Sequence, residues 1–140
     1  MSALNSVCLC GSTRFLEDFR TANLELTSCG LTVVTMAATD EEGAGWVKTR
    51  PGKKTLFDLV HLNKILKTDA VVVVGDGYIG ESTSREILWA NMQGKLIYEV
   101  RFAQTWEELA RAIYQGEDWE SSFHLIQKAK DILDAAARAL

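Results

Sequence analysis

Ala70-Val71-Val72-Val73-Val74 decides the fold class, because it is the longest uninterrupted apolar run of the chain and four of its five residues are β-branched. Short runs of this kind are typical of strands buried on both faces of a parallel sheet. A glycine-rich turn, residues 75–81, follows, and residues 82–93 then show helical spacing up to Gly94. The run is therefore predicted to be a buried strand that leads into a helix.

The alternation of strand and helix continues on both sides of this stretch. Upstream, the apolar run 7–10 precedes a helical pattern over 15–26, and the β-branched run 31–36 precedes a helical pattern that ends at Thr68. Downstream, residues 96–100 form a fourth predicted strand. This order is the signature of right-handed βαβ units. We expect a three-layer α/β fold, with a parallel sheet of four or five strands flanked by helices.

The size and charge of the chain exclude several classes of function. Its 140 residues suit a single domain, 1–140, with C-terminal helices over about 105–140 that begin at a capping box, Thr105–Glu108. The 15 Lys and Arg against 19 Asp and Glu give a net charge of −4, without the basic patch that duplex nucleic acid requires. The sequence shows neither a membrane span nor a secretory signal, so we expect a cytoplasmic protein.

The three cysteines, Cys8, Cys10 and Cys29, are an odd number that does not suit a disulfide framework. Cys8 and Cys10 alternate along a predicted strand and therefore share one of its faces. No second pair of cysteine or histidine residues has the spacing of metal ligands, so we expect no metal and no other cofactor.

Ligands of parallel α/β sheets bind beyond the carboxyl ends of the strands. Three loops are expected at that edge: Gly11–Arg14, 37–54 and Gly75–Glu81. The second contains the single proline, Pro51, and shows no periodicity, so we expect a long functional loop without regular structure. Nearly all unusual polar residues lie in these loops, which makes this edge the expected binding site.

Gly11-Ser12-Thr13-Arg14 joins the first predicted strand to the first helix. Its glycine permits a tight turn, and its hydroxyls, the helix N-terminus and the Arg14 guanidinium together favour an anion such as phosphate. In the alternative interpretation, Ser12 or Thr13 only caps the helix and Arg14 is solvated.

Gly80-Glu81-Ser82-Thr83-Ser84-Arg85-Glu86 opens the helix after the central strand. Gly80 and the three hydroxyl residues would face the same crevice and bind the ligand. Glu86 is expected in the first turn, where the helix dipole favours an ionised carboxylate suited to nucleophilic attack on an anomeric carbon. The alternative is structural, since Thr83 and Glu86 also have the spacing of a capping box.

Further candidates flank the central strand. Asp58 and His61 lie one helical turn apart on one face of the preceding helix, where Asp58 also suits a capping position. Asp76 and Tyr78 lie in the turn after the strand, and turns favour Asp in any case. We take Asp58, His61 and Asp76 as candidate catalytic residues beside Glu86, and Tyr78 as a substrate-binding residue.

These segments occur in an ordered set that begins with Leu9-Cys10-Gly11-Ser12-Thr13-Arg14-Phe15. It continues with Asp58, Thr68-Asp69, the strand 70–74, Gly80–Ser84, Glu86 to Ala90, and Gly94-Lys95. Over about residues 7–100 the set resembles the nucleoside 2-deoxyribosyltransferase-like superfamily, and the first loop resembles its branch of 2′-deoxynucleoside 5′-monophosphate N-glycosidases. The resemblance implies a flavodoxin-like (Rossmann-like) fold. It also implies cleavage of the N-glycosidic bond of a nucleoside or nucleoside 5′-monophosphate, by hydrolysis or 2-deoxyribosyl transfer, without a metal.

The resemblance also implies roles for individual residues. A glutamate at the position of Glu86 attacks the anomeric carbon, and an acid assists departure of the base. The family's aspartate stands eight residues before the Asp that opens the strand. Here that position is His61, while Asp58 lies one turn earlier, so the acid is Asp58 or His61. Gly11–Arg14 and Ser82–Ser84 would bind phosphate and sugar.

The expected partner is a small-molecule nucleotide or nucleoside, and the alternative function is a non-catalytic nucleotide-binding or sensor domain on the same fold. Relatives in the family often build the active site across a dimer. Trp106, Tyr114, Trp119 and Phe123 are expected to be exposed aromatic residues of a self-association surface. We therefore expect a homodimer or a larger homo-oligomer.

Overall fold

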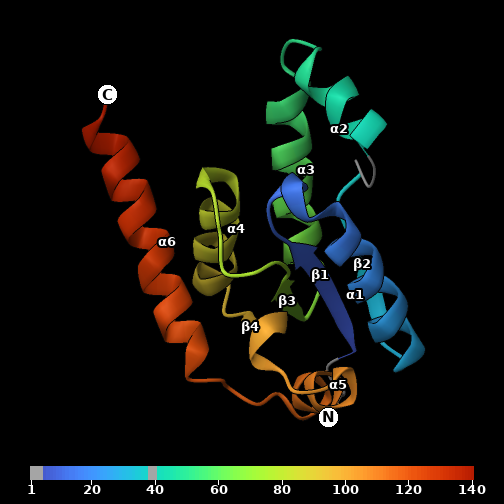
Figure 1. The fold of residues 1–140 in the computed structure, drawn as a ribbon. Helices are drawn as coiled ribbons and strands as arrows, with labels where there is room; N and C mark the ends of the chain where they lie inside the picture. The colour runs from blue at the N-terminus through green and yellow to red at the C-terminus, as the bar shows by residue number, and fades with distance from the viewer. Residues whose placement is uncertain (1–4, 38–40) are drawn as a thin grey trace.

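The computed structural model describes residues 5–37 and 41–140, in which four parallel strands form one sheet with helices on both faces (Figure 1). The strands are β1 (Ser6–Cys10), β2 (Thr32–Val34), β3 (Ala70–Val73) and β4 (Leu96–Glu99). The helices are α1 (Leu16–Ser28), α2 (Glu41–Lys48), α3 (Lys53–Leu66), α4 (Glu81–Met92), α5 (Trp106–Gln115) and α6 (Ser121–Arg138), with short 3-10 turns at Thr13–Phe15 and Val100–Phe102. The predicted three-layer α/β fold is confirmed.

The strand order is β2-β1-β3-β4, the flavodoxin-like arrangement. Val7 pairs with Ala70 and Cys10 with Val73, so β1 and β3 run side by side in the centre of the sheet. After β2 the chain passes to the other side of β1, and the order of the strands changes direction between β1 and β3. In open α/β sheets the ligand crevice lies beyond the carboxyl ends of the strands at such a point.

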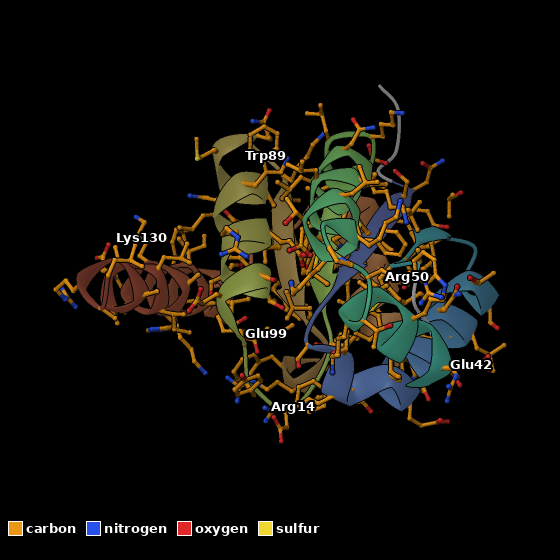
Figure 2. The ribbon with its side chains drawn as sticks, turned by 90° about the horizontal axis from the view of Figure 1, so that it is seen from above. Arg14, Glu42, Arg50, Trp89, Glu99 and Lys130 are labelled. Atoms are coloured by element: carbon orange, nitrogen blue, oxygen red, sulfur yellow. The ribbon has the colours of Figure 1, made fainter. Side chains whose placement is uncertain are left out.

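Each face of the sheet is covered by its own set of helices. Val7 and Leu9 point toward α1 and α5, whereas Cys8 and Cys10 point to the opposite face, which α3, α4 and α6 cover. Both views show α4 between α3 and α6 (Figures 1 and 2). The two cysteines therefore lie beneath the helices that carry Asp58, His61 and Glu86.

The stretch 37–54, predicted to lack regular structure, instead contains α2 and the start of α3, so that prediction is wrong. Residues 38–40 of this stretch lie outside the described part of the chain. The Trp46 ring of α2 stacks on Phe57 of α3, with ring centroids 6.1 Å apart, and the Arg50 guanidinium lies 4.1 Å from the Trp46 ring centre. Contacts between aromatic rings thus stabilise a glycine-containing helix of low intrinsic propensity.

The C-terminal segment confirms one expectation and corrects another. Thr105 caps α5, because its Oγ1 accepts a hydrogen bond from the backbone N–H three residues later at 3.0 Å. Trp106, Tyr114 and Trp119 were expected to be exposed, but all three pack against the core, and only Phe123 of the four has a mostly exposed side chain. Among the described residues, no helix has the length and apolar character that crossing a membrane requires.

Candidate active site

A cavity of about 710 Å³ opens at the carboxyl edge of the sheet. Its lining comes from the segments after β1 and β2, from α1, α2, α3 and α4, and from the turn after β3. These segments include the three loops that the sequence placed at this edge. The cavity therefore lies at the reversal of strand order between β1 and β3, where the topology favours ligand binding.

Most of the candidate residues from the sequence line this cavity. They are Gly11, Ser12, Thr13, Asp58, His61, Tyr78, Gly80, Ser82, Thr83 and Glu86. Three others lie outside the lining: Arg14, Asp76 and Ser84. Residues from segments far apart in the sequence thus meet at one place, although the sequence overestimated their number.

Glu86 lies on the floor of the cavity, but not in the local environment that the sequence predicted. The helix α4 begins at Glu81, so Glu86 is in its second turn. The N-cap residue is Gly80, which has no side chain to form a capping hydrogen bond. The expected first-turn position and the Thr83–Glu86 capping box are therefore both wrong. Burial raises the pKa of the Glu86 carboxyl from its ordinary 4.5 to about 7, while the positive charge of His61 opposes this shift.

His61 of α3 lies beside Glu86. Its Nε2 is 3.9 Å from Oε1 of Glu86, and both side chains are about nine-tenths buried. Burial is the largest effect on the pKa of His61 and lowers it, but the hydrogen bond with Cys8 and the negative charges of Glu86 and Cys8 raise the pKa above its usual value. Nδ1 of His61 is buried, and no described residue forms a hydrogen bond with it.

Two thiols lie directly behind His61. Its Nε2 is 3.6 Å from Sγ of Cys8 and 3.5 Å from Sγ of Cys10. A hydrogen bond with Cys10 lowers the pKa of the Cys8 thiol, whereas burial raises that of Cys10. The sequence showed that Cys8 and Cys10 share a strand face but not that His61, 51 residues after Cys10, faces them.

Asp58 belongs to a charged network at the rim of the cavity. It is not a capping residue, because α3 begins at Lys53. The Nζ of Lys54 donates to Oδ2 of Asp58 at 3.0 Å and to Oγ of Ser82 at 2.9 Å. Arg85 also donates to Ser82, at 3.2 Å, and lies 4.0 Å from Asp58. Two cations therefore meet a hydroxyl and a carboxylate where α3 approaches α4.

Arg14, Asp76 and Ser84, which lie outside the lining, and their neighbour Ser12 have local partners. The Arg14 guanidinium lies 3.7 Å from the centre of the Tyr78 ring, and Oδ1 of Asp76 accepts a hydrogen bond from the backbone N–H of Tyr78 at 3.3 Å. Ser12 accepts one from the backbone N–H of Arg14 at 3.3 Å, and Ser84 donates to the carbonyl of Gly80 at 2.7 Å. Ser12 therefore caps the short 3-10 turn, as its structural interpretation expected, and the Arg14 side chain stacks on Tyr78.

No protein-family model and no curated protein matches this chain. Among solved structures, the chain is similar to a CMP N-glycosidase, BcmB, of Clostridium botulinum, with 19% sequence identity and a TM-score of 0.44. The match covers 90% of this chain and 98% of the other. A likeness of this size does not identify an activity.

Proposed function

We propose that the chain cleaves the N-glycosidic bond of a nucleoside 5′-monophosphate or nucleoside, with Glu86 as the nucleophile. The observation that carries the proposal is the placement of a single buried carboxylate on the floor of a cavity of about 710 Å³, beneath a rim of hydroxyls and cations. A volume of this size is typical of small-molecule sites. The likeness of the first loop and of the segment around Glu86 to the deoxyribosyltransferase-like superfamily supports the same reaction.

The lining supports a ligand with one anionic end and one apolar end. Lys54 and Arg85 both donate to Ser82 at the rim, where a phosphate would accept from all three. Leu56, Phe57 and Val60 supply an apolar wall for the faces of a base. A nucleoside monophosphate has this combination of groups.

In the proposed reaction an oxygen of the ionised Glu86 carboxylate forms a bond to C1′ of the sugar. The bond from C1′ to the base nitrogen breaks, its electron pair leaves with the base, and a proton neutralises the departing nitrogen. The transition state resembles an oxocarbenium ion, which a nearby carboxylate stabilises. Water then attacks C1′, the bond from C1′ to Glu86 breaks, and the proton of the water passes to the group that protonated the base; in a transfer reaction the nitrogen of a second base takes the place of water.

The structure favours Asp58 over His61 as the source of the proton. The side chain of Asp58 is one-third exposed, whereas that of His61 is one-tenth exposed, with Nε2 toward the thiols and Nδ1 buried. Lys54 donates to both Asp58 and Ser82, so a phosphate bound at this rim would lie beside the Asp58 carboxyl. We assign His61 the role of a positioning residue for Glu86.

The test is a panel of nucleosides and their 5′-monophosphates, with free base measured by chromatography. We expect release from the monophosphates, a loss of roughly a thousandfold or more in Glu86→Gln, and an unchanged rate in Glu107→Gln, an exposed glutamate on α5. Lys54→Ala should raise KM for monophosphates more than for nucleosides. Release that Glu86→Gln does not alter would overturn the assignment.

Two further measurements distinguish the mechanism and the alternative function. If Glu86 is the nucleophile, intact-mass analysis during turnover should detect a chain that carries one sugar phosphate, and Glu86→Gln should not. Tight binding of a nucleotide by calorimetry, with no base released from any substrate of the panel, would instead favour a nucleotide sensor. In that case the burial of Glu86 would be the physical reason for the missing chemistry.

A further inference from the structure

The group behind the cavity floor consists of Cys8, Cys10 and His61. Their three ligand atoms, the two Sγ atoms and Nε2, all lie within 4.8 Å of one another. Cys8 and Cys10 are successive residues on one face of β1, and His61 extends from α3 toward both of them. All three residues are buried.

The two nitrogen–sulfur distances match the edges of a metal-centred tetrahedron. Zinc binds sulfur at about 2.3 Å and nitrogen at about 2.0–2.1 Å, so a tetrahedral angle places the two ligand atoms roughly 3.5 Å apart. The observed separations of Nε2 from the two sulfurs are 3.6 and 3.5 Å. Both nitrogen–sulfur distances therefore have the length that a shared zinc ion requires, and the two sulfur atoms lie within 4.8 Å of each other.

A fourth ligand lies close by. Oε1 of Glu86 is 3.9 Å from Nε2 of His61, and the corresponding nitrogen–oxygen edge of a zinc tetrahedron is about 3.4 Å. A small rotation of the Glu86 side chain that moves Oε1 by about half an ångström toward His61 would close this difference. The set of ligands would then be two thiolates, one imidazole and one carboxylate, which suits zinc better than magnesium or calcium.

We propose that Cys8, Cys10 and His61 bind a thiophilic divalent cation, zinc above all, with Glu86 in the fourth position. A metal on Nε2 leaves the His61 proton on Nδ1. Since the cation would hold the carboxylate that we propose as the nucleophile, zinc would inhibit the glycosidase reaction. That consequence rests on the proposed function, whereas the binding itself does not.

The first experiment is a titration of the reduced full-length chain with Co²⁺, which reports its ligands by absorption. Binding of one ion per chain by Cys8 and Cys10 should give a thiolate-to-cobalt charge-transfer band and the strong visible bands of tetrahedral cobalt, and one equivalent of Zn²⁺ should remove both. Cys8→Ser and Cys10→Ser should each weaken binding at least about tenfold. Cys29→Ser is the matched control and should bind as the wild type does.

Glu86→Gln should keep the charge-transfer band and change only the visible bands, because it alters one ligand and leaves both sulfurs. This variant separates the two proposals, since it tests metal binding in a chain that cannot attack a sugar. If no substrate is ever cleaved, the cobalt spectra still decide the metal proposal. If the spectra fail while base release occurs, the metal proposal alone is wrong.

A measurement on the wild-type chain is needed because serine at these buried positions could prevent folding. X-ray absorption of the zinc-loaded chain should show two sulfur neighbours at about 2.3 Å and nitrogen or oxygen neighbours at about 2.0–2.2 Å. Zinc coordinated only by nitrogen and oxygen, or cobalt without a charge-transfer band, would overturn the proposal.

Discussion

Glu86→Gln is expected to stabilise the metal-free chain at neutral and alkaline pH and to give no such gain at acid pH. Gln has nearly the same shape as Glu and no charge, so it fits the same buried position. The unfolded chain releases the Glu86 proton near the ordinary pKa of 4.5, whereas the folded chain holds it up to about 7. Between these values the folded state binds more protons than the unfolded state, so stability falls as the pH rises.

The size of the effect follows from the two pKa values. A difference of that size corresponds to roughly 3 kcal/mol, acquired between pH 4.5 and about 7 and constant above it. Relative to the wild type, Glu86→Gln should therefore gain at least about 2 kcal/mol on going from pH 5 to pH 8.

The assay is urea unfolding of the wild type and variant at pH 5, 6, 7 and 8 with a chelator present, followed by circular dichroism. Glu107→Gln provides the matched control, because the same change at an exposed site measures the substitution without burial. The decisive quantity is how the difference in unfolding free energy changes with pH, so a constant effect of the substitution cancels. A difference that stays equal at pH 5 and 8 would refute the reasoning, since it would mean that water solvates Glu86 in the folded chain.

Three further predictions concern the framework of the site. Thr105→Ala should lower the free energy of unfolding by about 1 kcal/mol through loss of the α5 cap, and Thr105→Ser should restore it, as urea unfolding can show. Gly75→Ala should lower the free energy of unfolding by roughly 2 kcal/mol more than Gly52→Ala does. Both glycines have positive φ, but only at Gly75 would a Cβ atom meet the ring of Phe15, at 2.6 Å. Asp69→Asn should lose stability at pH 7 but much less at pH 2, because hydrogen bonds from residues 5 and 6 lower the pKa of its carboxyl.

The sequence predicted the sheet well because its signals are local. The β-branched runs at 31–36 and 70–74 and the glycines after β1 and β3 report on the residues where they stand. The helix α2 escaped prediction for the opposite reason. It contains two glycines, and the contacts that stabilise it, Trp46 on Phe57 and Arg50 on Trp46, come from side-chain packing that helix propensity does not describe.

The site was predicted in part, and the errors also have a physical cause. The sequence placed the cavity at the correct edge of the sheet, and it predicted three of its lining residues from their positions relative to the strands: Asp58, His61 and Glu86. The turn in which Glu86 lies does not, because the backbone of Gly80, and not a capping side chain, sets the start of α4. The direction of the Glu86 pKa shift was missed for a different reason, because burial by packing that is distant in the sequence raises the pKa of this carboxyl.

The geometry of the site depends on how α3 and α4 pack against each other. Nε1 of Trp89 on α4 donates to the backbone carbonyl of Leu62 on α3 at 3.1 Å. Leu62 follows His61 directly, and Trp89 lies one helical turn after Glu86. Figure 2 shows Trp89 at the opposite end of the view from Arg14. The indole therefore holds together the two backbones that set the 3.9 Å between His61 and Glu86. A sugar or a metal ion at the floor of the cavity would meet a carboxylate whose position is fixed by packing between two helices, and both proposals depend on that spacing.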